Sequence, residues 1–215
     1  MLRRINMDFE ALKNAMADLE EDVLLGFMDE VMADGGSNVN EAVAAMQEGM
    51  QLVGSRFESG EYFVADLIYA GEIMTGAMDV IKPALAGESS GAAGRMILCT
   101  VKDDLHDIGK NIVKAMLEAS GFEVIDLGID TPAEKIVDTA KKENISIIAL
   151  SGVLTLALDS MKGVVEAFEA AGMRENVKII IGGAPVSEEA CANTGADAWA
   201  HSPQKTVDIC KSWLN

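Results

Sequence analysis

The spacing of apolar residues changes once along this chain of 215 residues, and that change predicts two halves of different construction. Up to residue 85, apolar residues recur at alternating intervals of three and four, which places them on one stripe of each helix. The predicted helices cover residues 8–19, 20–32, 39–57 and 63–83, the last ending at Pro83. Because short connections favour antiparallel neighbours, residues 1–85 are expected to form a four-helix bundle without strands.

From residue 95 onward, short runs rich in β-branched residues alternate with helical segments. The predicted strands are residues 96–101, 123–126, 145–150, 178–181 and 196–199, and helices should begin near Ile108, Pro132, Leu158, Ser187 and Pro203. Five such units predict a parallel sheet with helices on both faces, a flavodoxin-like (Rossmann-like) domain over residues 95–215. Residues 86–94, rich in Gly, Ser and Ala, predict a flexible linker that lets the halves move.

Charge and composition exclude several classes of function. Thirty-five acidic against seventeen basic residues give a formal net charge of −18, which would repel nucleic-acid phosphates and anionic lipids. The longest uncharged apolar stretch, residues 145–158, is too short to span a bilayer, and no secretory signal is visible. The three cysteines, Cys99, Cys191 and Cys210, form no CxxC motif and indicate buried thiols. We expect a cytoplasmic protein that binds neither nucleic acid nor membrane.

One histidine follows the first strand of the predicted sheet. In such sheets, ligands bind beyond the carboxyl ends of the strands, where the strand order reverses. Asp104 precedes His106 by two residues, and in an extended loop its carboxylate can accept the second N–H of the imidazole. This arrangement fixes the tautomer of a metal-bound histidine. The alternative is an ordinary surface histidine in a polar turn.

A metal bound by protein side chains alone is disfavoured. The other histidine, His201, lies far away in the sequence, and no Cys/His cluster could complete a zinc site. A single histidine suffices where a macrocycle supplies the remaining ligands. The loops after the third and fourth strands add glycines and hydroxyls that could line a slot for a long ligand: Ser151, Gly152, Thr155, Gly182 and Gly183.

Four segments carry a shared pattern. They are Asp104-Leu-His106-Asp-Ile-Gly109, Ser151-Gly152-Val153, Gly182-Gly183 and, in the helical half, Phe57-Glu-Ser-Gly-Glu-Tyr-Phe63. The first three resemble the cobalamin-binding signature of B12-dependent methyltransferases, and the fourth resembles the helical cap domain of the same proteins. In size and layout the chain is similar to the stand-alone corrinoid proteins of three-component methyltransferase systems.

This resemblance implies a role for each matching residue. His106 would be the lower ligand of cobalt in base-off/His-on cobalamin, and Asp104 would be hydrogen-bonded behind it, the two forming the catalytic pair. Gly109 would make room for the displaced nucleotide tail, and Phe63 would belong to the apolar cap over the methyl face. Further implied cofactor contacts are Asp107, Ile108, Ser151, Val153, Thr155, Gly182 and Gly183. Ala157 replaces a serine of methionine synthase, so proton uptake should end at Asp104 or at water.

The resemblance implies the cobalamin-carrying subunit of a methyltransferase system rather than a complete enzyme. Its cobalt would cycle between Co(I) and methyl-Co(III). The methyl group would come from a methoxyaromatic, methylamine, betaine or methanol through a substrate-specific methyltransferase. A second methyltransferase would pass it to tetrahydrofolate or coenzyme M, and a reductive activator is a further implied partner. A cobalamin-dependent sensor or regulatory module and the cobalamin subunit of a mutase are the alternatives.

Overall fold

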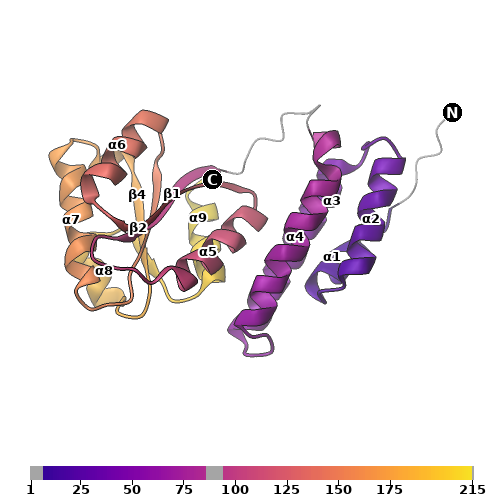
Figure 1. Cartoon of the computed structure of the whole chain (residues 1–215), viewed down its shortest axis with the longest axis horizontal. Coiled ribbons are helices and arrows are strands. Elements are labelled where there is room, and N and C mark those ends of the chain that lie inside the picture. The colour runs from indigo at the N-terminus through magenta and orange to yellow at the C-terminus, as the bar shows by residue number, and fades with distance from the viewer. Residues whose placement is uncertain (1–6, 86–93, 215) are drawn as a thin grey trace. The chain divides into compact units, whose positions relative to one another are not determined.

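The computed structural model describes residues 7–85 and 94–214 and divides the chain into two compact units, Met1–Gly91 and Ala92–Asn215 (Figure 1). The predicted linker, residues 86–94, lies outside the described residues except for Gly94, which begins the first strand. Each unit is built around its own core of apolar side chains.

The described part of the first unit is helical. Its helices are α1 (Phe9–Ala17), α2 (Glu21–Ala33), α3 (Val39–Glu58) and α4 (Val64–Leu85). Helix α1 packs on α3, and α4 packs on both α2 and α3. Gly49 permits the close approach of α1 to α3, because a Cβ there would lie 2.6 Å from the main-chain oxygen of Lys13. The expected four-helix bundle is confirmed.

Two details at the ends of α4 differ from the prediction. Pro83 does not end the helix, which continues to Leu85, because a proline disturbs the preceding turn rather than the residues that follow it. Phe63 lies before the helix, where its N–H donates to Asp66 Oδ2 at 2.7 Å. Its side chain is 70% exposed, although the apolar stripe predicted it at the start of the buried face.

The second unit is a five-stranded parallel sheet with the strand order β2-β1-β3-β4-β5. The strands are β1 (Gly94–Val101), β2 (Phe122–Thr131), β3 (Ile147–Ser151), β4 (Lys178–Gly182) and β5 (Ala198–Ala200). The helices are α5 (Asp107–Ala119), α6 (Ala133–Glu143), α7 (Ala157–Ala170), α8 (Glu188–Thr194) and α9 (Pro203–Ser212). The strand order reverses between β1 and β3, so the flavodoxin-like prediction is confirmed.

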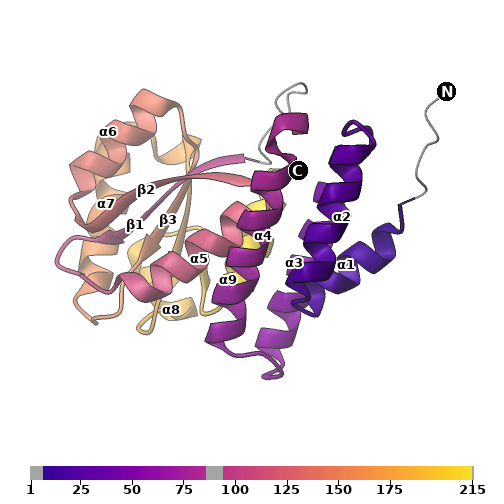
Figure 2. The same ribbon diagram turned by 45° about the vertical axis from the view of Figure 1, so that its right-hand side comes forward.

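Helices cover both faces of this sheet. Helix α5 packs beside α9, whereas α6, α7 and α8 pack in sequence on the opposite face (Figures 1 and 2). Alternate residues of β1 therefore point into different layers, and Ile97, Cys99 and Val101 join the core under α6 and α7. Burial raises the pKa of the Cys99 thiol to about 12. No helix within the described ranges is long and apolar enough to cross a membrane.

Strand β2 is longer than the sequence predicts. We expected it to end at Asp126, but it continues to Thr131 through an irregular stretch in which Leu98 pairs with Asp126 and Cys99 with Gly128. Gly128 has a φ of +87°, and its N–H donates to Asp126 Oδ1 at 2.9 Å. Glycine and aspartate are typical strand breakers, and here they form the bulge that carries β2 toward the loop after β1.

Candidate functional site

The loop after β1 presents His106 at the carboxyl edge of the sheet. A tight turn joins the Asp104 N–H to the oxygen of Val101 at 3.2 Å, and Asp103 occupies the left-handed region at a φ of 66°. Aspartate tolerates this conformation better than most residues. The turn directs Asp104 inward, where it is fully buried, and leaves His106 as the residue that precedes α5.

The Asp104 carboxylate accepts hydrogen bonds from both sides. Its Oδ1 lies 3.1 Å from His106 Nδ1 and 2.9 Å from the His106 main-chain nitrogen. Its Oδ2 accepts the main-chain N–H groups of Val153 and Leu154 at 2.8 and 3.1 Å, from the loop after β3. Burial alone would raise the pKa of Asp104, but these donors outweigh it and hold the pKa below its usual value.

The ionised Asp104 carboxylate fixes the tautomer of His106, that is, which ring nitrogen carries the hydrogen. A carboxylate can only accept, so the facing Nδ1 must be the donor, and Nε2 keeps its lone pair for another ligand. The His106 side chain is 51% exposed, and within the described residues the ring has no other hydrogen-bonding partner. The pair that the sequence placed two residues apart is thus brought together with Nε2 accessible.

Two glycines allow the loops after β3 and β4 to touch. Gly183 has a φ of +121°, and a Cβ at this position would overlap the main-chain oxygen of Gly152. Gly152 in turn donates its N–H to the oxygen of Gly182 at 3.1 Å. A Cβ on Gly152 would overlap the side chain of Ala157 and lie 3.6 Å from Asp104 Oδ2. The glycines therefore hold the amides of the β3 loop against the Asp104 carboxylate.

The surroundings of His106 are apolar and open. Several large hydrophobic side chains from the loops after β1 and β3, the first turn of α5 and the end of β2 are exposed to solvent: Leu105, Ile108, Ile129, Val153, Leu154 and Leu156. A Cβ on Gly109, in the first turn of α5, would meet nothing within 4 Å. Exposed apolar clusters of this kind mark binding surfaces.

These residues fit a metal that brings most of its own ligands. Within the described ranges, no group of three or more His, Cys, Asp or Glu side chains could hold a metal ion. His106 supplies one nitrogen, and the apolar side chains around it suit a large, flat, mostly apolar group. The open space beside Gly109 leaves room for an appendage of such a group.

A buried ion pair fixes α5 to β2 just behind this site. Lys110 Nζ lies 2.6 Å from Asp126 Oδ2, and the Lys110 side chain is 3% exposed. Burial tends to raise the pKa of Asp126, but the Lys110 ammonium and the Gly128 amide hold it below its usual value. The more exposed Lys114 stands 3.7 Å from the same oxygen.

Asp126→Asn is expected to lower the free energy of unfolding by about 3 kcal/mol at neutral pH, because Lys110 is left buried without a charged partner. A carboxylate of lowered pKa stabilises the fold above its unfolded-state pKa of about 4 and loses that contribution as the pH falls through its folded-state pKa. In urea unfolding, the difference in unfolding free energy between wild type and Asp126→Asn should therefore be constant from about pH 7 to about pH 5 and should vanish as the pH falls below about pH 4. Lys114→Ala, the control, should cost under about 1 kcal/mol. A gap that persists in acid would contradict the charge-based explanation.

The other predicted site residues are distributed over both units. Ser151 and Gly182 end β3 and β4 and pair with each other, and Asp107 and Thr155 are exposed at the same edge. Phe63 belongs to the helical unit. Trp199 is partly buried, with the His201 ring edge-on at 5.1 Å and Lys205 Nζ 4.8 Å from its centroid.

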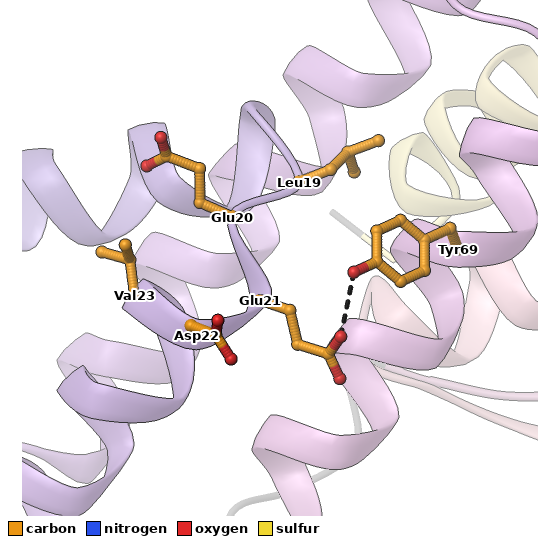
Figure 3. Close-up of a pocket in the computed structure, with 6 residues that line it drawn as sticks. All are labelled: Leu19, Glu20, Glu21, Asp22, Val23 and Tyr69. Atoms are coloured by element: carbon orange, nitrogen blue, oxygen red, sulfur yellow. Dashed lines mark hydrogen bonds between the residues drawn. The ribbon is translucent and has the colours of Figure 1, made fainter.

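A separate pocket lies on the helical unit, at the turn between α1 and α2 (Figure 3). It is lined by Leu19, Glu20, Glu21, Asp22, Val23 and Tyr69. The Tyr69 hydroxyl donates to Glu21 Oε2 at 2.9 Å and ties α4 to the start of α2. This hydrogen bond is the main cause that raises the pKa of Tyr69. Glu20 and Asp22 are exposed.

Sequence reasoning missed several residues that support the site. Leu154 contributes its main-chain N–H, which donates to Asp104. Leu105 and Leu156 contribute exposed side chains, although hydrophobic residue types would be expected in the core. Lys110 stands in the same motif as His106 and Gly109, and its position one turn into α5, facing β2, could have indicated the ion pair.

Each unit matches a known protein-family model. Residues 94–207 match a protein-family model described as the B12 binding domain, and residues 8–82 match a second model with the same description. Trimethylamine corrinoid protein 1 of Methanosarcina acetivorans is 35% identical over 204 residues, covering 94% of each chain. A corrinoid protein of Desulfitobacterium hafniense is 32% identical over 208 residues, covering 95% of this chain and 96% of the relative.

Solved structures are similar to nearly the whole chain. The crystal structure of a novel cobalamin-binding protein from Desulfitobacterium hafniense superposes with a TM-score of 0.88 at 49% identity, covering 97% of this chain and 100% of that chain. A chain of the methanol:cobalamin methyltransferase complex of Methanosarcina barkeri superposes with a TM-score of 0.80 at 22% identity, covering 99% of this chain and 81% of that chain. The second similarity shows a shared fold.

Proposed function

This chain belongs to the corrinoid proteins of methyltransferase systems, which are built from B12 binding domains, and on that premise we propose that it is a methyl carrier. Bound cobalamin would supply a cobalt that takes up a methyl group as Co(I) and holds it as methyl-Co(III). One observation carries the proposal. A buried carboxylate holds His106 with Nε2 accessible at the sheet edge where the strand order reverses.

In this proposal His106 Nε2 would be the protein ligand of cobalt, in the base-off/His-on form. Asp104 keeps the imidazole in the required tautomer and orients the ring through its Nδ1 hydrogen bond of 3.1 Å. The surrounding side chains, Ile108 and Val153 among them, are exposed in the protein and would exclude water from the imidazole once cobalamin is bound. We assign Ser151, Thr155, Gly182 and Gly183 to the walls along the nucleotide tail.

Release of the imidazole from cobalt would be coupled to the uptake of a proton. Ala157 brings no hydroxyl, and all four hydrogen bonds of the Asp104 carboxylate come from the His106 ring and three main-chain amides. Their effect on the pKa of Asp104 favours the ionised carboxylate. We infer that the proton would come from water, while Asp104 stays charged.

Gly109→Leu tests where the nucleotide tail lies. Because the Cβ of residue 109 faces open space in a helix, the substitution should raise the unfolding free energy of the cofactor-free protein by about 0.5 kcal/mol. The leucine would occupy the room left for the tail, so the affinity for cobalamin should fall at least about tenfold, or 1.4 kcal/mol. Isothermal titration with cobalamin and with cobinamide, which lacks the tail, separates the two effects.

Gly163→Leu is the matched control, since Gly163 lies within α7 and its Cβ also meets nothing within 4 Å. It should leave both affinities unchanged. If Gly109→Leu weakened cobinamide as much as cobalamin, the tail would not pass over Gly109.

The methyl transfer itself is tested with the full chain. Protein loaded with methylcobalamin is mixed with tetrahydrofolate or coenzyme M and a methyltransferase for that acceptor, with free methylcobalamin as the control. The protein-bound methyl group should be consumed much faster than the free one. The reduced protein should likewise accept methyl groups from methylamines, methanol, betaine or methoxyaromatics through a substrate-specific methyltransferase. Tight cobalamin binding without methyl exchange in either direction would contradict the carrier role.

A further inference from the structure

We propose that Thr100 and Asp130 are positioning residues that hold the main chain of Asp104 and thereby set the ring tautomer of His106. The inference deepens the proposed function, because it concerns the residue assigned there as the cobalt ligand. It rests on hydrogen bonds among β1, β2 and the loop after β1, and on the burial of one hydroxyl.

Thr100 is a fully buried polar residue near the end of β1. Its hydroxyl donates to the main-chain oxygen of Asp104 at 2.6 Å and accepts the Asp130 N–H at 3.0 Å. The hydroxyl is thus satisfied as donor and as acceptor. Valine has the same shape as threonine and would fill this space equally well. The hydroxyl is therefore needed only to join the Asp104 oxygen to the Asp130 N–H.

Asp130 holds the same loop from β2. Its N–H also lies 3.1 Å from the Asp104 oxygen, and its Oδ1 accepts the Asp103 N–H at 2.8 Å. Asp103 and Asp130 both occupy the left-handed region, with φ values of 66° and 48°. Each such conformation is strained in an L-residue, and mutual hydrogen bonds between the two segments stabilise both.

The Asp104 residue is therefore held at both ends. Its carboxylate is fixed by the amides of Val153 and Leu154, and its main chain by Thr100 and Asp130. A rotation of the Asp104 backbone would turn Oδ1 away from His106 Nδ1, where the present separation is 3.1 Å. The hydroxyl of Thr100 acts on the ring through Asp104 and touches no ligand itself.

The test uses Thr100→Val, which removes the hydroxyl at constant shape, and Thr100→Ser, which restores it. Nitrogen NMR of the full, cofactor-free chain at alkaline pH reports which nitrogen of each imidazole carries the hydrogen. His201 is the only other histidine in the sequence and serves as the internal reference. We expect the wild-type His106 to be predominantly the Nδ1–H tautomer, Thr100→Val to lose that preference, and Thr100→Ser to recover it, with His201 unchanged throughout.

A stability loss in Thr100→Val with an unchanged His106 tautomer would overturn the proposal, because a merely structural hydroxyl predicts that result. If Thr100→Val does not fold, Asp130→Ala at an exposed position gives the second variant, and it should shift the tautomer in the same direction. The measurement needs no cobalamin, so its failure is distinct from failure of the carrier role. In cobalamin-loaded protein, Thr100→Val should lower the fraction of cobalt bound by histidine.

Discussion

His106→Ala is expected to abolish the coupling of cobalt to a protein nitrogen in protein-bound cobalamin and to lower the affinity for cobalamin at least about 100-fold, since loss of a hydrogen-bonding partner behind a metal ligand alone costs 10- to 100-fold. The reason is that His106 is the histidine held by the buried Asp104 carboxylate, whereas His201, which follows β5, packs edge-on against Trp199. Electron paramagnetic resonance of the Co(II) form measures the nitrogen coupling directly.

The same substitution should leave the cofactor-free fold nearly unchanged. The His106 side chain is half exposed, and Asp104 keeps three main-chain donors when the imidazole is removed. The free energy of unfolding should therefore stay within about 0.5 kcal/mol of wild type. His201→Ala is the matched control, because it removes the chain's other imidazole and should preserve the nitrogen signal. In protein labelled with 15N and loaded with unlabelled cobalamin, coupling of cobalt to a 15N nucleus that survives in His106→Ala would refute the assigned ligand.

The positions of the elements followed from the sequence pattern. Each helix buries one apolar stripe, and the strands are short runs of buried apolar residues covered on both faces. The α3 stripe of Met46, Met50 and Val53 is buried as its spacing predicts, and all five parallel strands were expected. The continuation of β2 beyond Asp126 could not be predicted, because local propensities around Gly128 favour a turn. Long-range hydrogen bonds to the loop after β1, such as that between Asp130 and Thr100, overcome this preference.

The site was predictable in its side chains and not in its main-chain contacts. Asp104 and His106 are two residues apart, and in an extended loop this spacing turns both side chains the same way, so the sequence indicates their contact. The main-chain donors of Val153 and Leu154 could not be predicted from the residue types, because every residue except proline has an N–H. They explain how the carboxylate is satisfied when Ala157 offers no hydroxyl.

Gly183→Ala is expected to be among the most destabilising single-methyl additions in the chain. Its φ of +121° is a region that L-residues rarely adopt, and the new Cβ would overlap the Gly152 oxygen. Strain and overpacking together predict a loss of at least about 3 kcal/mol in the free energy of unfolding, measured by urea denaturation. Gly172→Ala provides the control for backbone strain alone, since Gly172 has a φ of +67° but open space around its Cβ, and should cost about 1 kcal/mol.

The effect of Gly183→Ala should also reach the cofactor site. A displacement of Gly152 by the new methyl group would withdraw the adjacent Val153 and Leu154 amides from Asp104. At a temperature where the variant is still folded, cobalamin retention during gel filtration should fall, whereas Gly172→Ala should retain it fully. Equal costs for the two variants would mean that the loops after β3 and β4 separate easily. In that case their contact would not be what holds the carboxylate donors in place.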